Sequence, residues 1–377
     1  MRVLGNFLSS FQIKCFKDSV VLLYVFCFFV CTSVFSAVIE IDSLDELQQI
    51  GNDAAYPLDG EYVLTQDIDA SATLNWNDGA GFIPIGTSES PFAGKFDGNG
   101  HKIMSLYVNY NLNYNGLFSY ISSVGEVKNL MLDDCWVEGY MYVGGLVAIN
   151  EGSITNCHST GFVLGYKYVG SLVGINYGLV TNSYSMGSVS DFLSGEYLGG
   201  LVGKNDGGIV TNSYSMCSVS GFRQVGGLAG INDSDGSITN SYSIGKVSGS
   251  IYVGGLVGVN YSGGITTCYF AGKVAGTGPN ISDIGGLVGY NDEGTVVNSY
   301  WDVETSGQSS SSGGEGKTTA EMKQQLTYTG WDFSSVWDID EGINYPYLRI
   351  LGHTVEIPLK QIGTLDELSK IGVDAEY

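Results

Sequence analysis

Residues 252–260 read YVGGLVGVN, and this phrase decides the fold because it recurs along the centre of the chain. Five further copies end at Asn150, Asn176, Asn205, Asn232 and Asn291. Each copy is followed by a second phrase of the type SITNSYS, found at residues 237–243, and most are closed by a short Gly-x-Val-Ser phrase. A fixed period of about 28 residues indicates a repeat architecture in which each unit stacks on its neighbours.

The repeats predict strands rather than helices. Apolar residues alternate with small or polar ones over four to six positions, bounded by Gly, Asn or Ser, and no phrase carries a helical stripe. Along residues 252–260 this alternation places Val253 and Val257 on one face and Leu256 on the other. Three short strands per repeat predict one coil of a parallel β-solenoid, and a degenerate earlier copy at residues 115–130 brings the total to about seven coils.

Stacked coils turn each position of the repeat into a ladder. The apolar ladder predicted for the core consists of Ile154, Val180, Val210, Ile238, Ile265 and Val297. A structural ladder of asparagines follows two residues on, at Asn156, Asn182, Asn212, Asn240 and Asn298, with Thr267 as the one exception. Asn tolerates left-handed backbone at a bend, and stacked amides can hydrogen-bond along the axis.

The cysteines of the repeats are predicted to be free thiols. Cys157 and Cys268 share a register otherwise filled by Ser, four coils apart, and Cys135 and Cys217 share another register. Four coils span roughly 19 Å, which is far beyond the reach of a disulfide. A disulfide between ladders within one coil remains the alternative.

The phrase G-G-L-V-G-x-N followed by I-x-N-S-Y resembles the GLUG motif, and the resemblance extends from about Asn111 to Trp301. Residues 92–103 resemble the opening phrase that often precedes such repeats, and residues 330–348 the closing phrase. The family occurs in bacterial surface proteins, including adhesin-like chains and the non-catalytic part of some immunoglobulin-A-cleaving metallopeptidases. The resemblance therefore implies location and architecture rather than a chemical activity.

The flanks predict two caps and the start of a further module. A capping box at Ser43–Glu46 opens a short helix, and a second box begins at Thr318. Residues 362–377 match residues 41–56 at 10 of 16 positions, so the chain is expected to be a piece of a longer tandem-module protein. The predicted organisation is 1–37 signal peptide, 38–110 N-terminal cap with helix and opening phrase, 111–302 GLUG-type solenoid, 303–350 loop, helix and aromatic C-terminal cap, and 351–377 linker and start of a second module.

Composition and the N-terminus predict export. Basic residues precede an apolar run from Val20 to Cys31, and small residues follow, which is the order of a secretory signal; an uncleaved anchor is the alternative. The mature chain is therefore expected to be secreted or at the cell surface, without a membrane span. A net charge of −23 argues against nucleic acid as a partner, because phosphates would be repelled.

No motif for catalysis is found in the sequence, and no catalytic or metal-ligating residue is predicted. The three histidines, at positions 101, 158 and 353, lie far apart and form no H-E-x-x-H. No cofactor is expected, although acidic clusters at Asp67/Asp69, Asp233/Asp235, Asp292/Glu293 and Asp338/Asp340/Glu341 leave calcium as an alternative to solvated turns.

Tyrosine ladders are the candidate binding residues. One consists of Tyr184, Tyr214, Tyr242, Tyr269 and Tyr300, and another of Tyr142, Tyr168, Tyr197 and Tyr252. Exposed aromatic rings would stack on sugars or dock a protein, whereas buried rings would only stabilise the solenoid. The predicted function is a non-catalytic structural or adhesive surface module that presents a rigid ladder to carbohydrate or protein. The alternative is a carbohydrate-active enzyme, a lyase or hydrolase, on a β-helix.

Overall fold

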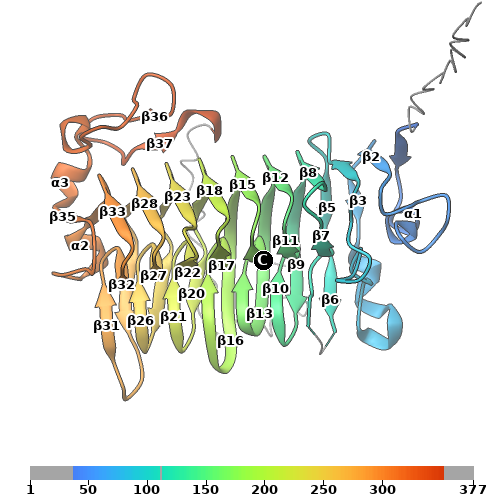
Figure 1. Cartoon of the computed structure of the whole chain (residues 1–377), viewed down its shortest axis with the longest axis horizontal. Coiled ribbons are helices and arrows are strands. Elements are labelled where there is room, and N and C mark those ends of the chain that lie inside the picture. The colour runs from blue at the N-terminus through green and yellow to red at the C-terminus, as the bar shows by residue number, and fades with distance from the viewer. Residues whose placement is uncertain (1–36, 111–112, 352–377) are drawn as a thin grey trace, which may run out of the picture. The chain divides into compact units, whose positions relative to one another are not determined.

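The computed structural model describes residues 37–110 and 113–351, whose strands form a parallel β-solenoid of about seven coils. The chain winds through three parallel sheets, here called sheets A, B and C, and Figure 1 shows the coils side by side. Short helices lie near both ends of the stack: α1 (Leu44–Gln49), α2 (Val303–Ser306) and α3 (Thr319–Met322). The predicted all-β solenoid with small α/β caps is confirmed.

Sheets A and C each contribute one short strand to a coil. Sheet A consists of β1 (Ile39–Ile41), β2 (Glu61–Leu64), β4 (Lys95–Asp97), β8 (Glu126–Lys128), β12 (Ser153–Thr155), β15 (Leu179–Thr181), β18 (Ile209–Thr211), β23 (Ser237–Thr239), β28 (Gly264–Thr266) and β33 (Thr295–Val297). Sheet C consists of β7 (Phe118–Ile121), β11 (Val147–Asn150), β14 (Val173–Asn176), β17 (Val202–Asp206), β22 (Ala229–Asp233), β27 (Val257–Tyr261) and β32 (Val288–Asp292).

Sheet B is the long side of the coil. In two coils it is one extended strand, and in the later coils the same path is divided into three short strands. Its strands are β3 (Ile68–Asp69), β5 (Lys102–Met104), β6 (Tyr107–Asn109), β9 (Met131–Glu138), β10 (Met141–Gly144), β13 (His158–Gly170), β16 (Tyr184–Gly199), β19 (Tyr214–Ser215), β20 (Ser218–Ser220), β21 (Arg223–Gly226), β24 (Tyr242–Ser243), β25 (Lys246–Gly249), β26 (Ile251–Gly254), β29 (Tyr269–Phe270), β30 (Lys273–Gly276), β31 (Ser282–Gly285), β34 (Tyr300–Asp302) and β35 (Glu315–Lys317).

The Gly-Gly-Leu-Val segment is a corner between two sheets. Strand β26 ends at Gly254 and β27 begins at Val257, so the phrase passes from sheet B to sheet C. A Cβ atom at Gly254 would lie 2.0 Å from the carbonyl oxygen of Val257, which is too close for any residue with a side chain. Leu256, Val253 and Val257 are all buried in one core. The predicted alternation is therefore wrong, because the corner turns both sets of side chains inward.

The inward ladder of sheet A forms part of the core. Ile154, Val180, Val210, Ile238 and Ile265 pair in register and are buried. The next member is Val296, which pairs with Ile265, whereas Val297 is 47% exposed. The predicted assignment of Val297 to the core is wrong, because side chains alternate along β33 and Val297 faces outward.

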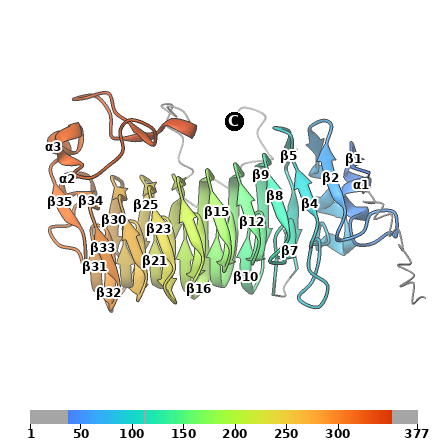
Figure 2. The ribbon, with the colours of Figure 1, turned by 45° about the horizontal axis from the view of Figure 1, so that its top comes forward.

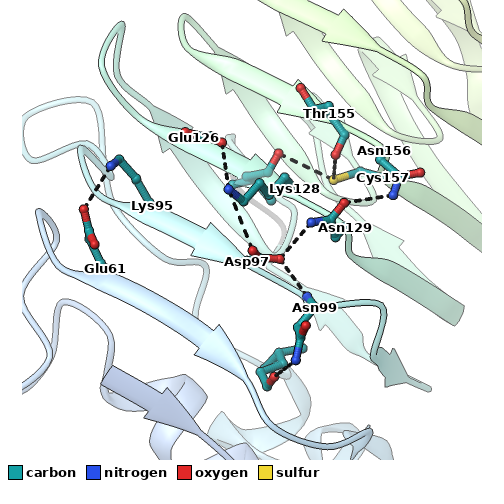
Figure 3. Close-up of polar contacts among 12 residues, drawn as sticks. Glu61, Lys95, Asp97, Asn99, Glu126, Lys128, Asn129, Thr155, Asn156 and Cys157 are labelled. Atoms are coloured by element: carbon teal, nitrogen blue, oxygen red, sulfur yellow. Dashed lines mark hydrogen bonds and ion pairs between the residues drawn. The ribbon is translucent and has the colours of Figure 1, made fainter. Parts of the chain in front are cut away.

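The corner between sheets A and B holds the predicted asparagine ladder. Asn156, Asn182, Asn212, Asn240 and Asn298 all have positive φ, between 45° and 53°, and Thr267 has 51°. Figure 3 shows the start of this row, where Asn156 donates to Oδ1 of Asn129 at 2.9 Å and Asn129 donates to Asp97 at 3.0 Å. The row of left-handed residues thus begins before the first residue of the predicted ladder.

Caps close the described part of the chain. At α1 the Ser43 hydroxyl accepts from the backbone of Glu46, but the Glu46 carboxylate accepts from Asp42, so the box is only half formed. The box of Thr318 and Glu321 at α3 is complete. Beyond α3, the orange-to-red segment with the antiparallel pair β36 (Trp337–Asp338) and β37 (Tyr347–Leu348) folds back over preceding coils (Figure 2).

The predicted signal peptide and the predicted second module lie outside the described residues, apart from Ala37 and Leu351. The domain boundaries remain predictions. Across residues 37–110 and 113–351, none of the helices has the length and apolar character needed to cross a membrane.

Candidate functional site

The first predicted tyrosine ladder is a continuous stack in sheet B. The rings of Tyr184, Tyr214, Tyr242 and Tyr269 lie 4.8–4.9 Å apart with planes within 10° of parallel. Tyr300 follows in register with Tyr269. At the other end the ring of His158 stacks on that of Tyr184, with ring centroids 3.9 Å apart. Burial lowers the pKa of His158 to about 4, so this ring is neutral near pH 7.

The C-terminal cap covers most of this stack. Tyr214, Tyr242, Tyr269 and Tyr300 are only 0, 4, 2 and 5% exposed, and Tyr184 is half-buried. Trp337 contacts Tyr242 and Tyr269, and the Tyr269 hydroxyl donates to the Pro346 carbonyl at 2.7 Å. We call Tyr184, Tyr214, Tyr242, Tyr269 and Tyr300 the covered tyrosine row. Its expected role as an exposed binding stripe does not fit the structure, because cap residues distant in sequence occupy its outer side.

A second tyrosine stack lies near the corner between sheets B and C and is not covered. Tyr114, Tyr142, Tyr168 and Tyr197 are partly exposed, and their ring centroids lie 4.8, 5.2 and 4.8 Å apart with planes within 21° of parallel. Each has positive φ, between 57° and 70°, so the backbone turns at each ring. We call these four residues the uncovered tyrosine row. Three of them immediately precede the Gly-rich corner of their coil.

Charged side chains accompany the uncovered tyrosine row. The Lys167 amine lies 5.2 Å from the ring centroid of Tyr168 and 5.1 Å from that of Tyr197, within cation–π range. Lys167 also pairs with Glu196 at 3.6 Å, and Arg223 lies 4.0 Å from Glu196. Burial alone would lower the pKa of Lys167, but Tyr168, Tyr197 and Glu196 raise it above its usual value, so the amine stays protonated.

The geometry of the uncovered tyrosine row decides what it can bind. Because the rings stack face to face, each inner ring has its faces occupied by its neighbours and presents an edge and a hydroxyl. No hydrogen bond of these four hydroxyls to another described residue is found. The row therefore presents one hydroxyl group per coil, at the spacing between neighbouring strands. It presents no free ring face along its length.

Tyr120 and Tyr177 carry further hydroxyls beside this row, from the sheet C side. Tyr120 donates to a carboxylate oxygen of Glu151 at 2.5 Å, and Tyr177 is 45% exposed. Burial, then the carboxylate of Asp206, raise the pKa of Tyr177. Both of these tyrosines stay protonated near neutral pH, so they can donate as well as accept.

A second, buried asparagine ladder, which the repeat pattern was not expected to form, lies near the ends of the sheet C strands. Each amide except the last donates to the Oδ1 of the next coil at 2.8–2.9 Å, and every amide donates to a nearby backbone carbonyl. Its members are Asn150, Asn176, Asn205, Asn232, Asn260 and Asn291. The signal was present, because these residues end every copy of the phrase. By contrast, Oδ1 of Asn182 and Oδ1 of Asn212 in the predicted ladder accept no hydrogen bond from the part of the chain that the structure describes.

The cysteines and the predicted acidic clusters have structural surroundings. Cys135, Cys157, Cys217 and Cys268 are buried and free, and burial raises the pKa of Cys157 and Cys268 to about 12. Asp67 bonds to His101 at 3.1 Å, and Asp233 pairs with Lys204 at 3.0 Å. Within the described ranges no group of three or more His, Cys, Asp or Glu side chains is placed to hold a metal ion.

Comparison with known proteins finds a known motif within the repeats. The GLUG motif matches residues 139–163, 194–215 and 223–248. Over 130 residues the chain is 38% identical to halomucin of Haloquadratum walsbyi, covering 33% of this chain and 1% of that protein. Over 150 residues it is 48% identical to a provisionally named Gly-rich membrane protein of Evansella cellulosilytica, covering 38% of this chain and 17% of the relative. The chain thus spans only small parts of both.

Solved structures share the fold. A protein provisionally described as an immunoglobulin A1 protease of Bacteroides ovatus matches with a TM-score of 0.54 and 19% identity, over 82% of this chain and 92% of that one. A structure named IgA1 protease matches with a TM-score of 0.55 and 18% identity, over 85% and 26%. At these identities the likeness concerns the fold alone. Three segments at the centre of this chain match the GLUG motif.

Proposed function

We propose that this protein is a non-catalytic surface module that binds a neutral carbohydrate chain along the uncovered tyrosine row. The observation that carries the proposal is the four-ring stack whose hydroxyls bond to no other described residue, beside the further tyrosines Tyr120 and Tyr177. A rigid row of this kind loses little conformational entropy on binding, because its rings are already held by their neighbours.

The spacing of the row suits an extended glycan. The rings repeat every 4.8–5.2 Å. This spacing is close to the ~4.8 Å between neighbouring strands, which is of the order of the length of one sugar unit in an extended chain. One hydroxyl group of each successive sugar can therefore meet one tyrosine hydroxyl, with Lys167 as an additional donor.

Charge favours a neutral ligand. The chain carries a net charge of −23, so a polyanion would be repelled at long range. The cations beside the row, Lys167 and Arg223, are both close to Glu196, which leaves little local charge to attract an acidic polymer. The name of one relative, a Gly-rich membrane protein, supports a location at a cell surface.

The test is calorimetric binding of three neutral hexasaccharides: β-1,4-linked glucose, β-1,4-linked N-acetylglucosamine and α-1,4-linked glucose. A Tyr142→Phe/Tyr168→Phe double variant keeps the stack and removes two hydroxyls. We expect it to bind at least about tenfold more weakly, since each lost hydrogen bond is worth roughly 1 kcal/mol. Tyr261→Phe, at a 38% exposed tyrosine outside the row, is the matched control and should bind as the wild type does.

Two results would count against the proposal. Wild-type protein that binds none of the three sugars, or a double variant that binds as tightly as wild type, would contradict it. New reducing ends formed during incubation with any of the sugars would show that the protein cleaves the chain. That result would favour the alternative, a carbohydrate-active enzyme.

A further inference from the structure

One charged residue interrupts an apolar ladder of sheet C. Lys204 pairs in register with Ile175 on one side and with Ile231 on the other. The members of this ladder in the nearby coils are buried aliphatic side chains, at Ile149, Ile175, Ile231 and Val259. Because the coil forms with an aliphatic residue at this position, the lysine is not needed to build the fold.

Lys204 holds two carboxylates together. Its amine lies 3.0 Å from Oδ2 of Asp206 and 3.0 Å from Oδ2 of Asp233, and the two aspartates pair in register on neighbouring strands. Burial alone would lower the pKa of Lys204, but hydrogen bonds to Asp206 and Asp233 raise it above its usual value, so the amine stays protonated. We call Lys204, Asp206 and Asp233 the charged trio.

The charged trio keeps hydrogen-bonding capacity that solvent can reach. The side chains of Lys204 and Asp206 are each 18% exposed, and that of Asp233 is 29% exposed. Within the described ranges Oδ1 of Asp206 accepts no hydrogen bond, and the Lys204 ammonium, a group with three donors, has these two carboxylates as its partners. An acceptor and a donor are therefore open to a group that approaches from outside.

Tyr177 joins the charged trio to the uncovered tyrosine row. It follows Asn176, which pairs with Asn205, so Tyr177 stands in register with Asp206. Its side chain is 45% exposed. Burial is the largest cause that raises the pKa of Tyr177, and groups from both sides act on this pKa as well: Asp206 and Lys204 from the trio, and Tyr142 and Tyr168 from the row. A ligand along the row can thus reach the trio.

We propose that the charged trio and Tyr177 form the subsite that selects the bound carbohydrate by two adjacent free hydroxyl groups on one sugar. One hydroxyl donates to the carboxylate of Asp206 and the other to that of Asp233. The Lys204 amine donates to an oxygen of the same pair. The inference rests on the proposed function and adds to it the residues that choose among neutral sugars.

Adjacent hydroxyl groups fit the charged trio better than charged groups do. A hydroxyl can donate to a carboxylate and accept from the lysine at once, whereas an ammonium group cannot accept and a ligand carboxylate cannot donate. A ligand carboxylate would also meet two negative charges and only one positive charge. A 4-linked glucose unit has two adjacent free hydroxyls, and in 4-linked N-acetylglucosamine an acetamido group replaces one of them.

The test compares, by calorimetry, the tighter-binding of the two glucose hexasaccharides with the N-acetylglucosamine hexasaccharide. Wild type should bind the glucose chain at least about tenfold more tightly, because it makes one more hydrogen bond to a charged group. Lys204→Ile restores the residue type of the ladder and should fold as stably as wild type by thermal midpoint, while the preference falls below about threefold.

A second variant and two controls keep the conclusion independent of one substitution. Asp206→Asn/Asp233→Asn keeps the size of both side chains, removes their charges and should also lose the preference, because hydrogen bonds to neutral acceptors are weaker. The matched controls are Lys246→Ile, at an exposed lysine of sheet B, and Asp235→Asn, at an exposed aspartate outside the trio. Both controls should keep the wild-type preference.

The outcomes separate this inference from the proposed function. If wild type binds the two kinds of chain equally, or if both trio variants keep the preference, the subsite is wrong; weak binding by Tyr142→Phe/Tyr168→Phe would then leave the tyrosine row standing. If wild type binds none of the sugars, both are overturned. Loss of the preference in both trio variants, with both controls normal, supports the subsite.

Discussion

The indole ring of Trp337 packs against the ring of Tyr242, with ring centroids 6.1 Å apart, and so joins the C-terminal cap to the middle of the solenoid. The same indole reaches Tyr269 at 6.1 Å and Trp331 at 4.4 Å. Because of this contact the two tyrosine rows have different roles. The covered row is part of a second apolar core, and only the uncovered row remains open to a partner.

Trp337→Ala should destabilise the protein by about 3–5 kcal/mol, because the indole is fully buried and its removal leaves a cavity over the covered tyrosine row. Urea unfolding would measure the loss. Trp337→Phe is the matched control and should cost clearly less, since the indole Nε1 has no hydrogen bond to any described residue to lose. Equal losses in the two variants would show that the cap is not held by this packing.

Ser213→Ala should destabilise the protein by about 1–3 kcal/mol, because the Ser213 hydroxyl accepts a hydrogen bond from the backbone N–H of Ser183 at 3.1 Å. Both residues belong to the buried Ser/Cys register of the repeats. The Ser213 hydroxyl also donates to the Thr211 carbonyl at 2.7 Å. Ser213→Cys should be nearly neutral, because Cys157 and Cys268 fill the same register. Thermal unfolding of the two variants would compare them, and an alanine variant as stable as the cysteine variant would contradict this role.

Asn205→Ala should cost roughly 2–4 kcal/mol, because its amide bonds to Asn176, Asn232 and the Gly208 carbonyl within the buried ladder. Asn212→Gly, in the same coil, should change stability by less than about 1 kcal/mol, since Gly accepts its left-handed backbone and its Oδ1 is unpartnered. Urea midpoints give both values. A larger loss of stability in Asn212→Gly than in Asn205→Ala would show that the asparagine ladder at the corner between sheets A and B, rather than the buried asparagine ladder, contributes more to stability.

Acid should destabilise the fold partly through His158. Burial holds its folded pKa at about 4, below the ordinary 6.5, so the unfolded chain binds a proton that the folded chain does not as pH falls between these values. The stabilisation that depends on neutral His158 is therefore complete above pH 6.5 and is lost as the pH falls toward 4. Over this range the free energy of unfolding changes by at most about 1.4 kcal/mol per pH unit on account of His158. His158→Tyr, which continues the stack, should show a smaller fall in urea midpoint from pH 7 to pH 4.5. An identical fall in both proteins would contradict it.

Much of the coil could be predicted from local pattern. The period, the Ser/Cys register and the left-handed residues at Asn156 and Thr267 follow from positions within one repeat. The position of Val296 could also have been read from the repeat, since it stands two residues before Asn298, as Ile265 stands before Thr267. The Gly-Gly corner was harder, because alternation describes a strand and cannot show that the chain turns inside the phrase.

The role of each tyrosine row could not be predicted from the repeat. Both rows have the same spacing and residue type, and the difference lies in Trp331 and Trp337, which belong to a segment outside the repeats. Only the folding back of that segment covers Tyr242 and leaves Tyr168 open.

The most direct test of the account is tyrosine modification by tetranitromethane, followed by peptide mass spectrometry, with and without the best-binding hexasaccharide. We predict that Tyr142, Tyr168 and Tyr197 react in the free protein and are protected by the sugar. Tyr242 and Tyr269 should not react in either case, because the cap buries them and burial raises the pKa of Tyr269 well above 10. Protection at Tyr242 or Tyr269, or unchanged reactivity of Tyr168 with bound sugar, would contradict the central claim.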